Sequence, residues 1–382
     1  MKDTFAHASL DGLVLGQAAM NAAHFLALPV LALHLAAIPE VGPSVAGLAL
    51  GLFLAIARIG PLVTGPLADR VGAWGAIRVG LALRAIGLAV VPFVDSPSSA
   101  YLAALLLGIG VALHEPAVYG ALGTADTHKR DRLLLRHVQA LNFGCVLGPG
   151  LALLAGWSTS TSFHIAAAAT AGVAVWACMQ RPHLTPRTHQ ATRGSVFTFD
   201  RHYVLFAMSL VPFWALFAQL FSALPILVAD AGGSDSWAQS VILINGLVGF
   251  AVVPLILPAL HRVGPRPILI AGCAIASASI GLLGMSLALL GLILLIVVLS
   301  VAETAVTAAA DVLTARHADG RSVAGRFGVL AVGTGIGTSL GAPLGVIAAD
   351  GEPLVLVILG AFGAMSCIAA FALPERKDTC TC

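Results

Sequence analysis

Long apolar stretches recur along the whole chain, and short polar connections separate them. A helix needs about 20 apolar residues to cross the hydrocarbon of a bilayer, and these stretches lack the period-two alternation of a membrane-spanning strand. The pattern therefore predicts an all-α membrane protein with twelve transmembrane helices. The expected spans are 12–36, 43–65, 76–94, 99–123, 136–157, 161–180, 203–229, 237–260, 267–287, 289–313, 325–348 and 353–373.

The composition supports a membrane protein and excludes other classes. Of the 382 residues, 58% are hydrophobic and 10% are charged, and the mean hydropathy is +0.96, whereas a soluble domain has about 25% charged residues. The sequence contains no phosphate-binding G-x-x-x-x-G-K-S/T loop and no recognisable set of catalytic nucleophile and base, so we expect no enzyme activity. The 12 histidines form no ligand set with a nearby carboxylate, so we expect no metal and no cofactor.

Basic residues indicate the orientation, because lysine and arginine accumulate in cytoplasmic loops. All 20 of them except Arg58 and Arg84 fall in the two termini or in loops that follow even-numbered spans. We therefore expect both termini in the cytoplasm of a bacterium and the helices in lipid of its inner membrane. The net charge of +2 is spread over many loops, so nucleic acid is not an expected partner.

The two halves of the chain resemble each other. The longest polar stretch, 181–202, is expected to form a cytoplasmic loop between residues 1–180 and 203–382, each with six helices. The phrases "FLALPVLAL", "PLADRVG" and "HEPAV" recur in the same order and at similar spacing as "FSALPILVA", "PALHRVG" and "AETAV". A parallel six-helix repeat is typical of secondary transporters that bind substrate between two halves. The repeat therefore predicts transport by alternating access.

Ionisable side chains inside the expected helices are candidates for function, because a charge there costs about 2.5–3.5 kcal/mol on insertion scales. Glu115, Arg58 and Arg84 lie at similar depths in three helices of the first half. Glu115 is a candidate proton carrier. The alternative is a static ion pair of Glu115 with Arg58 or Arg84 that stabilises the first half.

The second half offers further candidates for proton coupling. Glu303 occupies the position of Glu115 in the repeat, and Asp311 follows two turns later on a similar helix face. A carboxylate that binds a proton from one side and releases it to the other couples a proton gradient to transport. Glu303, Asp311 and His24 of the first helix are therefore added to Glu115 as proton-coupling candidates.

Polar residues inside the expected helices are candidates for substrate contacts. Gln17, Asn21 and His24 form a stripe on the first helix at the spacing of one helical face. A histidine that forms a hydrogen bond to a neighbouring helix is the competing account of His24. The candidate substrate-binding residues are Asn21, His24, Arg58, Arg84, His114, Gln219 and Asn245.

Glycines at four-residue spacing mark faces where another helix can approach closely. One such face contains Gly144 and Gly148, and a second contains Gly333, Gly337, Gly341 and Gly345. Close contact between two moving halves is one reading of these faces, and static helix packing is the other. Pro149 is expected to bend its helix, because proline lacks a backbone donor.

Two motifs carry a resemblance to a known family. "GPLADRVGAWGAIRVG" at 65–80 resembles the signature loop of the major facilitator superfamily, although the second basic residue is displaced to Arg78. "GCVLGPGLALLAG" at 144–156 resembles the antiporter motif through Gly144, Gly148 and Pro149, and departs from it at Leu151 and Ala152. The chain resembles the drug:proton antiporter branch of small twelve-helix multidrug exporters over its whole length.

The resemblance implies roles for the loop after the second helix. Asp69 and Arg70 are expected to follow a helix end, in a loop tightened by Gly65 and Gly72. In the family such a loop acts as a conformational latch between the two halves. His261 stands at the position of Asp69 in the second half.

These observations predict a proton-coupled secondary transporter that exports a small organic compound or drug by antiport. One alternative is an exporter of an anionic or zwitterionic metabolite, such as a siderophore or another metallophore. The other alternative is a membrane receptor that does not transport. The expected partners are a small-molecule substrate, protons and membrane lipid, and we expect a monomer.

Overall fold

The computed structural model describes residues 2–123, 125, 127–155, 157–180, 200–232, 236–285, 287–318, 323–349 and 351–373. Most of the expected loop 181–202 therefore lies outside the described residues, as do Arg321 and the C-terminal tail beyond residue 373. The described chain is helical throughout, with no strand in any of these ranges. The prediction of an all-α protein is confirmed to that extent.

The described residues of the first half form seven α-helices and one 3-10 turn. They are α1 (Lys2–Ala36), α2 (Gly42–Ile59), α3 (Pro61–Val71), α4 (Ala73–Val90), η1 (Val91–Phe93), α5 (Pro97–Leu122), α6 (Thr127–Ala155) and α7 (Thr159–Met179).

Nine α-helices and two 3-10 turns are formed by the part of the second half that the structure describes. They are α8 (Arg201–Ser209), α9 (Val211–Phe217), η2 (Ala218–Leu220), α10 (Ala223–Gly232), α11 (Ser236–Val263), α12 (Pro265–Leu283), α13 (Leu289–His317), α14 (Val323–Ala349), α15 (Leu354–Gly363), η3 (Ala364–Ile368) and α16 (Ala369–Ala372).

Nine helical stretches of the described residues are long and apolar enough to cross a membrane, or ten if α2 and α3 count as one bent span. The expected count of twelve also needs spans in α1 and α6, so that number stays a prediction. The expected span 43–65 is divided at Gly60, where α2 and α3 meet at 49°. Pro61 begins α3, and its missing backbone donor explains why the helix breaks there.

Helix ends confirm the sequence repeat at one place in each half. α3 ends at Gly72 with φ of +94°, and α11 ends at Gly264 with φ of +83°. Only glycine adopts this backbone conformation at little cost. Asp69 and Arg70 belong to the last turn of α3, so the prediction that they lie in a loop is wrong by about one turn.

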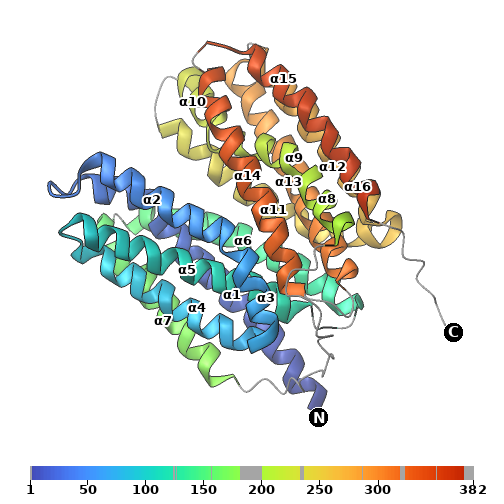
Figure 1. Cartoon of the computed structure of the whole chain (residues 1–382). Helices are drawn as coiled ribbons and strands as arrows, with labels where there is room; N and C mark the ends of the chain where they lie inside the picture. The colour runs from blue at the N-terminus through green and yellow to red at the C-terminus, as the bar shows by residue number, and fades with distance from the viewer. Residues whose placement is uncertain are drawn as a thin grey trace.

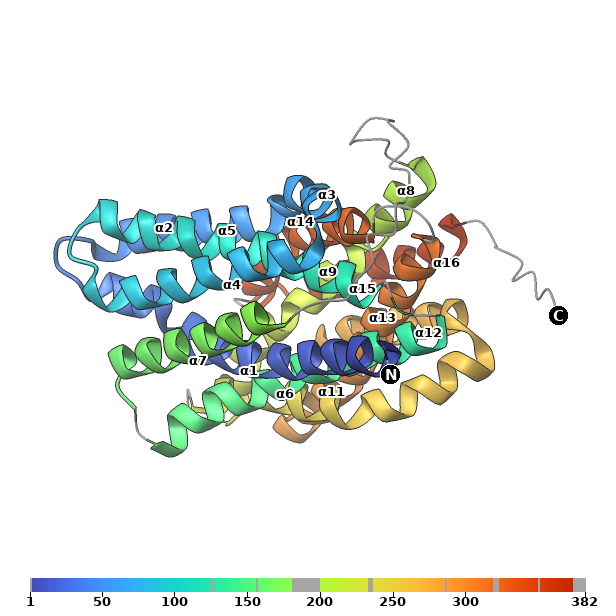
Figure 2. The ribbon, with the colours of Figure 1, turned by 90° about the horizontal axis from the view of Figure 1, so that it is seen from below.

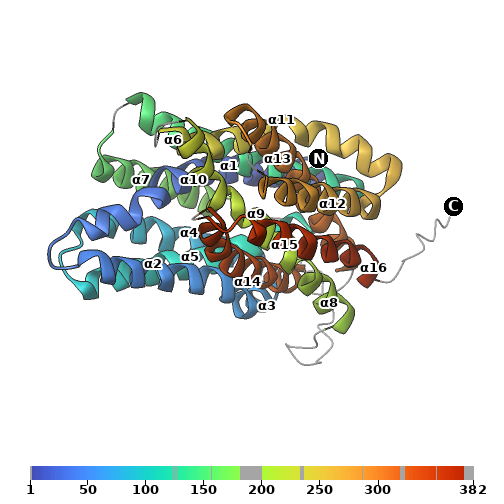
Figure 3. The same cartoon turned by 90° about the horizontal axis from the view of Figure 1, so that it is seen from above.

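The two halves converge at one end of the molecule. Figure 1 shows α1–α7 in one bundle and α8–α16 in another, with the bundles closest near the N-terminus. Helix pairs that join them include α2, α3 and α5 with α14, and α6 with α11 and α13. The pair α6 and α11 lies side by side in Figure 2, and α3 and α14 lie side by side in Figure 3.

The glycine faces pack helices inside each half, not between the halves. A Cβ atom on Gly148 would lie 2.4 Å from the carbonyl oxygen of Ala22 in α1. A Cβ atom on Gly341 of α14 would lie 2.4 Å from the carbonyl oxygen of Ala215 in α9. Static packing is therefore the correct reading of both faces, and the reading as sliding contacts between halves is wrong.

Replacing Gly148 with alanine should destabilise the protein, because the new methyl group meets backbone that cannot move aside. Overpacking of this kind costs about 1–3 kcal/mol. Gly150 is the matched control, because nothing lies within 4 Å of its added Cβ and alanine favours the helix by about 0.5–1 kcal/mol. Thermal denaturation in detergent should show a lower midpoint for G148A and no loss for G150A. Equal midpoints would contradict the packing shown here.

Candidate transport site and gate

The first contact between the halves joins α3 to the N-terminus of α14. Backbone N–H groups of Ala324 and Gly325 donate hydrogen bonds to the Asp69 carboxylate over 3.3 and 2.9 Å. These groups have no acceptor inside their own helix, and a negative charge is favoured at a helix N-terminus. Gly65 allows the close approach, since its Cβ would lie 2.6 Å from the Ala324 carbonyl oxygen.

The other residues of the expected latch do not join the halves. Arg70 is exposed, and Gly72 ends α3 with nothing within 4 Å of an added Cβ. Asp69 and Gly65 thus bridge the two halves, whereas Gly72 shapes the turn between α3 and α4. The latch role of these four residues stays a prediction.

A second contact between the halves is an ion pair that the sequence did not indicate. The Arg316 guanidinium of α13 lies 2.6 Å from the Asp131 carboxylate of α6, and only 4% of the Asp131 side chain is exposed. Arg316 counted as a loop charge in the sequence, and Asp131 stands among the basic residues of another expected loop. Removing one partner would leave an uncompensated buried charge, so loss of either side chain alone should destabilise the end where the bundles meet.

A third contact places Asp311 at the junction of the halves. Tyr119 of α5 stacks on Phe327 of α14, with ring centroids 4.0 Å apart and an interplanar angle of 11°. The side chain of Tyr119 also lies close to Asp311, which is 3% exposed. Asp311 therefore lies in the contact between the bundles, away from Glu303.

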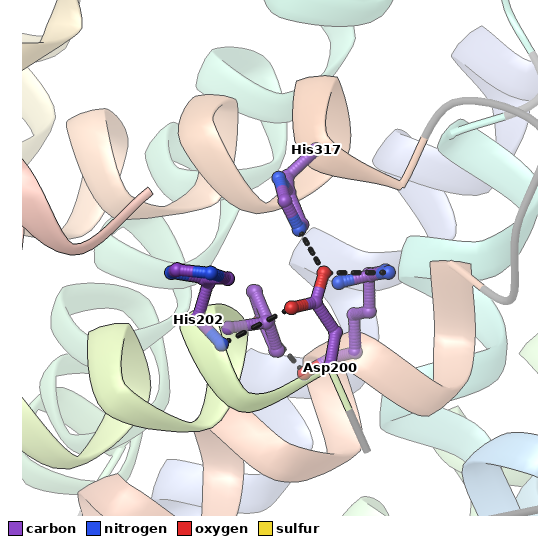
Figure 4. A network of polar contacts seen from close by, with 5 residues as sticks. Asp200, His202 and His317 are labelled. Atoms are coloured by element: carbon purple, nitrogen blue, oxygen red, sulfur yellow. Dashed lines mark hydrogen bonds and ion pairs between the residues drawn. The ribbon is translucent and has the colours of Figure 1, made fainter. Parts of the chain in front are cut away.

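Asp200 anchors the start of α8 to α13 and α14 (Figure 4). Its carboxylate accepts a hydrogen bond from His317 Nε2 at 2.7 Å and from the backbone N–H of His202 at 3.1 Å. Arg326 Nη2 lies 3.8 Å away, and its guanidinium stacks over the Tyr203 ring. Burial alone would raise the pKa of Asp200, but these hydrogen bonds and the charges of His317 and Arg326 hold that pKa below its ordinary value.

The Asp200 contacts predict a pH dependence of stability. A lowered pKa means that Asp200 stabilises the fold fully above the ordinary aspartate pKa, and that this contribution disappears as the pH falls through the lower folded value. At pH 7, D200N should unfold more easily by about 1–2 kcal/mol, as expected for a hydrogen bond to a charged group that is partly exposed. Thermal denaturation between pH 7 and pH 3 should show the difference from wild type shrinking toward acid.

H202A is the matched control for D200N, because only the backbone of His202 contacts Asp200. It should keep the wild-type pH profile. A D200N deficit that is the same at pH 3 and pH 7 would contradict a contribution from the Asp200 charge.

The three candidate charged residues of the first half, Arg84, Arg58 and Glu115, have different surroundings. Arg84 of α4 is 3% exposed, and its Nη2 lies 2.8 Å from His24 Nδ1 of α1. Arg58 of α2 is exposed, and its side chain packs against Gly335 of α14. Glu115 is half-buried, and no ion pair of the described residues joins it to Arg58 or Arg84. The alternative of a static Glu115 ion pair is therefore absent from this conformation.

Pro116, which follows Glu115 in α5, leaves one backbone carbonyl of its helix available to a neighbouring helix. Pro116 donates no hydrogen bond to the carbonyl of Ala112 one turn earlier. The Thr64 hydroxyl of α3 donates to that carbonyl instead, which ties α3 to α5 beside the acidic residue. The neighbouring His114 is 1% exposed, and its Nδ1 has no partner among the described residues.

The polar residues of α1 contact two different neighbouring helices. Gln17 Nε2 lies 3.5 Å from Asn21 Oδ1, and Asn21 packs against Gly144 of α6. His24 contacts Arg84 instead, as the competing account of an interhelical hydrogen bond predicted. Asn21 Nδ2 has no partner among the described residues.

Glu303 of α13 has only neutral partners among its described contacts. The hydroxyls of Thr307 and Thr304 donate to its carboxylate over 3.3 and 3.4 Å. Asn245 of α11 lies close to it, and donates to the Ser300 hydroxyl of α13 at 3.2 Å. Glu303 and Asn245, predicted separately, are thus brought together.

Gln219 is a packing residue in this structure. It is 0% exposed, and its Nε2 donates to the carbonyl oxygens of Ala215 and Gly341, each at 2.9 Å. The expectation that Gln219 faces substrate is therefore wrong for this conformation. No three or more His, Cys, Asp or Glu side chains of the described chain are grouped as metal ligands.

Paired helical bundles that meet at one end, with carboxylates inside the helices, define a membrane transporter of the two-domain type. A profile of the Major Facilitator Superfamily matches residues 13–288, and the chain belongs to this superfamily. It is accordingly a transporter and not an enzyme.

Known proteins similar to this chain include transporters from bacteria and from humans. "Multidrug resistance protein MdtH" of Yersinia pestis (strain Pestoides F) is 26% identical over 306 residues, which cover 78% of this chain and 76% of the relative. The human organic anion transporter MFSD10 has a TM-score of 0.74 at 15% identity, covering 94% of this chain and 98% of its own. FucP in its outward conformation has a TM-score of 0.74 at 15% identity, covering 96% and 99%.

Proposed function

We propose that this protein exports a small organic compound across a bacterial inner membrane in exchange for protons. The observation that carries the proposal is Glu303, a half-buried carboxylate whose described partners are all neutral. Such a group can gain or lose a proton without breaking an ion pair. An ionisable residue of this kind within a membrane helix is commonly functional.

The likeness to a multidrug resistance protein supports outward transport of organic compounds. In the proposed orientation, both termini lie in the cytoplasm, and the end where the bundles meet is the cytoplasmic end. The structure would then represent a state closed toward the cytoplasm. Because one chain contributes both bundles, we propose that the transporter works as a monomer.

An anionic or zwitterionic cargo is the second candidate. The buried Arg84, without an acidic partner in the described ion pairs, favours a negatively charged group on the substrate. Asn21, Arg58, Arg84, His24, His114 and Asn245 stay the proposed substrate contacts.

Proton movement in proteoliposomes tests the proposed function. Purified protein is reconstituted with a pH-sensitive dye inside, and lipophilic cations, anionic metabolites and metal chelators are added in turn. We expect at least one compound to drive proton movement in protein-containing vesicles only. A compound that is transported without any proton movement would overturn the proton coupling, and a protein that binds but never transports would favour a receptor.

A further inference from the structure

The first bundle contains a small pocket beside two of the proposed substrate contacts, His24 and Arg84. Helices α1, α2, α4, α5 and α7 surround it, and its volume is about 20 Å³. His24 and Arg84 are its polar lining residues, and the rest of the wall is apolar, with Phe53, Leu107 and Phe163 among its members. A space of this size accommodates one water molecule or a single ion.

Arg84 brings a positive charge to this pocket, and one nitrogen of its guanidinium group lacks a hydrogen-bond partner among the described residues. Nη2 contacts His24, but Nη1 is buried and has no hydrogen-bond partner among the described residues. His24 must accept this hydrogen bond through Nδ1, so it is neutral and does not offset the positive charge of Arg84. A buried cation without a paired anion is unfavourable.

Glu115 is the acidic residue whose charge acts on Arg84. It forms no ion pair with Arg84 within 4.0 Å in the described structure. Arg84 lines the pocket and its buried Nη1 lacks an acceptor among the described residues, and the apolar walls strengthen attraction between opposite charges. His24, the other polar lining residue, is only half-buried.

We propose that Arg84, oriented by His24, binds a compact monovalent anionic group in this pocket. The group is the carboxylate end of the transported compound or a chloride ion. The first alternative, a carboxylate of the transported compound, rests on the proposed function. It narrows the transported compounds to organic anions and zwitterions. The pocket holds only the charged end, so the remainder of a larger substrate extends past His24 toward the other half.

Binding to the purified full-length protein tests this site without any transport. The protein is kept in a chloride-free gluconate buffer and titrated with chloride, with benzoate, or with the neutral analogue benzamide, while its thermal midpoint is recorded. A ligand that binds only the folded state raises the midpoint, and the rise grows with the logarithm of the ligand concentration above Kd. We expect an anion to raise the midpoint and benzamide to leave it unchanged.

Variants assign the effect to Arg84. R84Q should weaken anion binding at least about tenfold, equivalent to about 1.4 kcal/mol. R132Q, which removes an exposed arginine of α6, should bind as wild type does. H24Q serves as a second variant if R84Q does not fold, and it should also weaken binding because Arg84 loses its orienting partner.

Each outcome of these titrations either distinguishes a carboxylate from chloride as the ligand or overturns the proposed anion site. Stabilisation by benzoate that chloride competes away indicates a carboxylate site, and stabilisation by chloride alone indicates an ion site. Equal effects of benzoate and benzamide, or no effect of either anion on the wild type, would overturn the proposal and leave Glu115 as the group that compensates Arg84. Anion binding without export in liposomes would overturn only the proposed function.

Discussion

Replacing Glu303 with glutamine is expected to abolish substrate-driven proton movement while the protein stays folded. Glutamine has nearly the same shape, and its amide oxygen can still accept the hydrogen bond of Thr307, while Thr304 keeps the Ser300 carbonyl oxygen as its acceptor. It cannot release a proton, so any cycle that needs a charged and a neutral Glu303 stops. We expect the proton flux in proteoliposomes to fall to less than about a tenth of the wild-type rate.

Two further variants show whether proton movement depends on the ionisable carboxylate of Glu303 or on its hydrogen-bond partners. E303D keeps an ionisable group and should retain part of the flux. T307V removes only a neutral hydrogen-bond donor and should lower the flux by about twofold to fivefold, as expected for a net loss of about 0.5–1 kcal/mol. A normal flux in E303Q would show that Glu303 is structural, and the same measurement on Glu115, Asp311 and His24 would then locate the proton carrier.

The general architecture follows from the sequence because it depends on composition and spacing. Apolar stretches of sufficient length must become helices in a bilayer, since all backbone polar groups need partners there. The motif around Gly72 and its counterpart at Gly264 correctly marked equivalent helix ends in both halves. Glu303 was found for the same reason, because a carboxylate in an apolar helix is conspicuous in any sequence.

The contacts between the halves could not be predicted in this way. Hydropathy gives the depth of a residue in a helix, but it does not say which neighbouring helix the residue meets. Asp131 and Arg316 are 185 positions apart, and each alone is an ordinary charge near a helix end. Gln219 illustrates the converse, because its polarity suggested a substrate contact whereas the carbonyls of α9 and α14 satisfy it.

A disulfide between α5 and α14 is expected to arrest the transporter reversibly. A Cβ atom at Gly120 would lie 3.1 Å from Cβ of Ala324, and disulfides join Cβ atoms about 3.5–4.5 Å apart. The double variant G120C/A324C, with the native cysteines replaced by serine, should therefore cross-link on mild oxidation after a small adjustment. Alternating access requires this contact between the halves to open, so the cross-linked protein should lose at least about nine-tenths of its transport rate.

Addition of a reductant provides the decisive comparison, because it should restore transport in the same protein sample. The single variants G120C and A324C should transport equally well with and without the oxidant. A cross-linked protein that transports at the reduced rate would show that the contact between α5 and α14 does not open during the cycle. Failure of the cross-link to form would contradict the arrangement of Gly120 and Ala324. If transport stops only while the bond is present, the contacts of Asp69, Tyr119 and Asp131 belong to a gate that must break in each cycle.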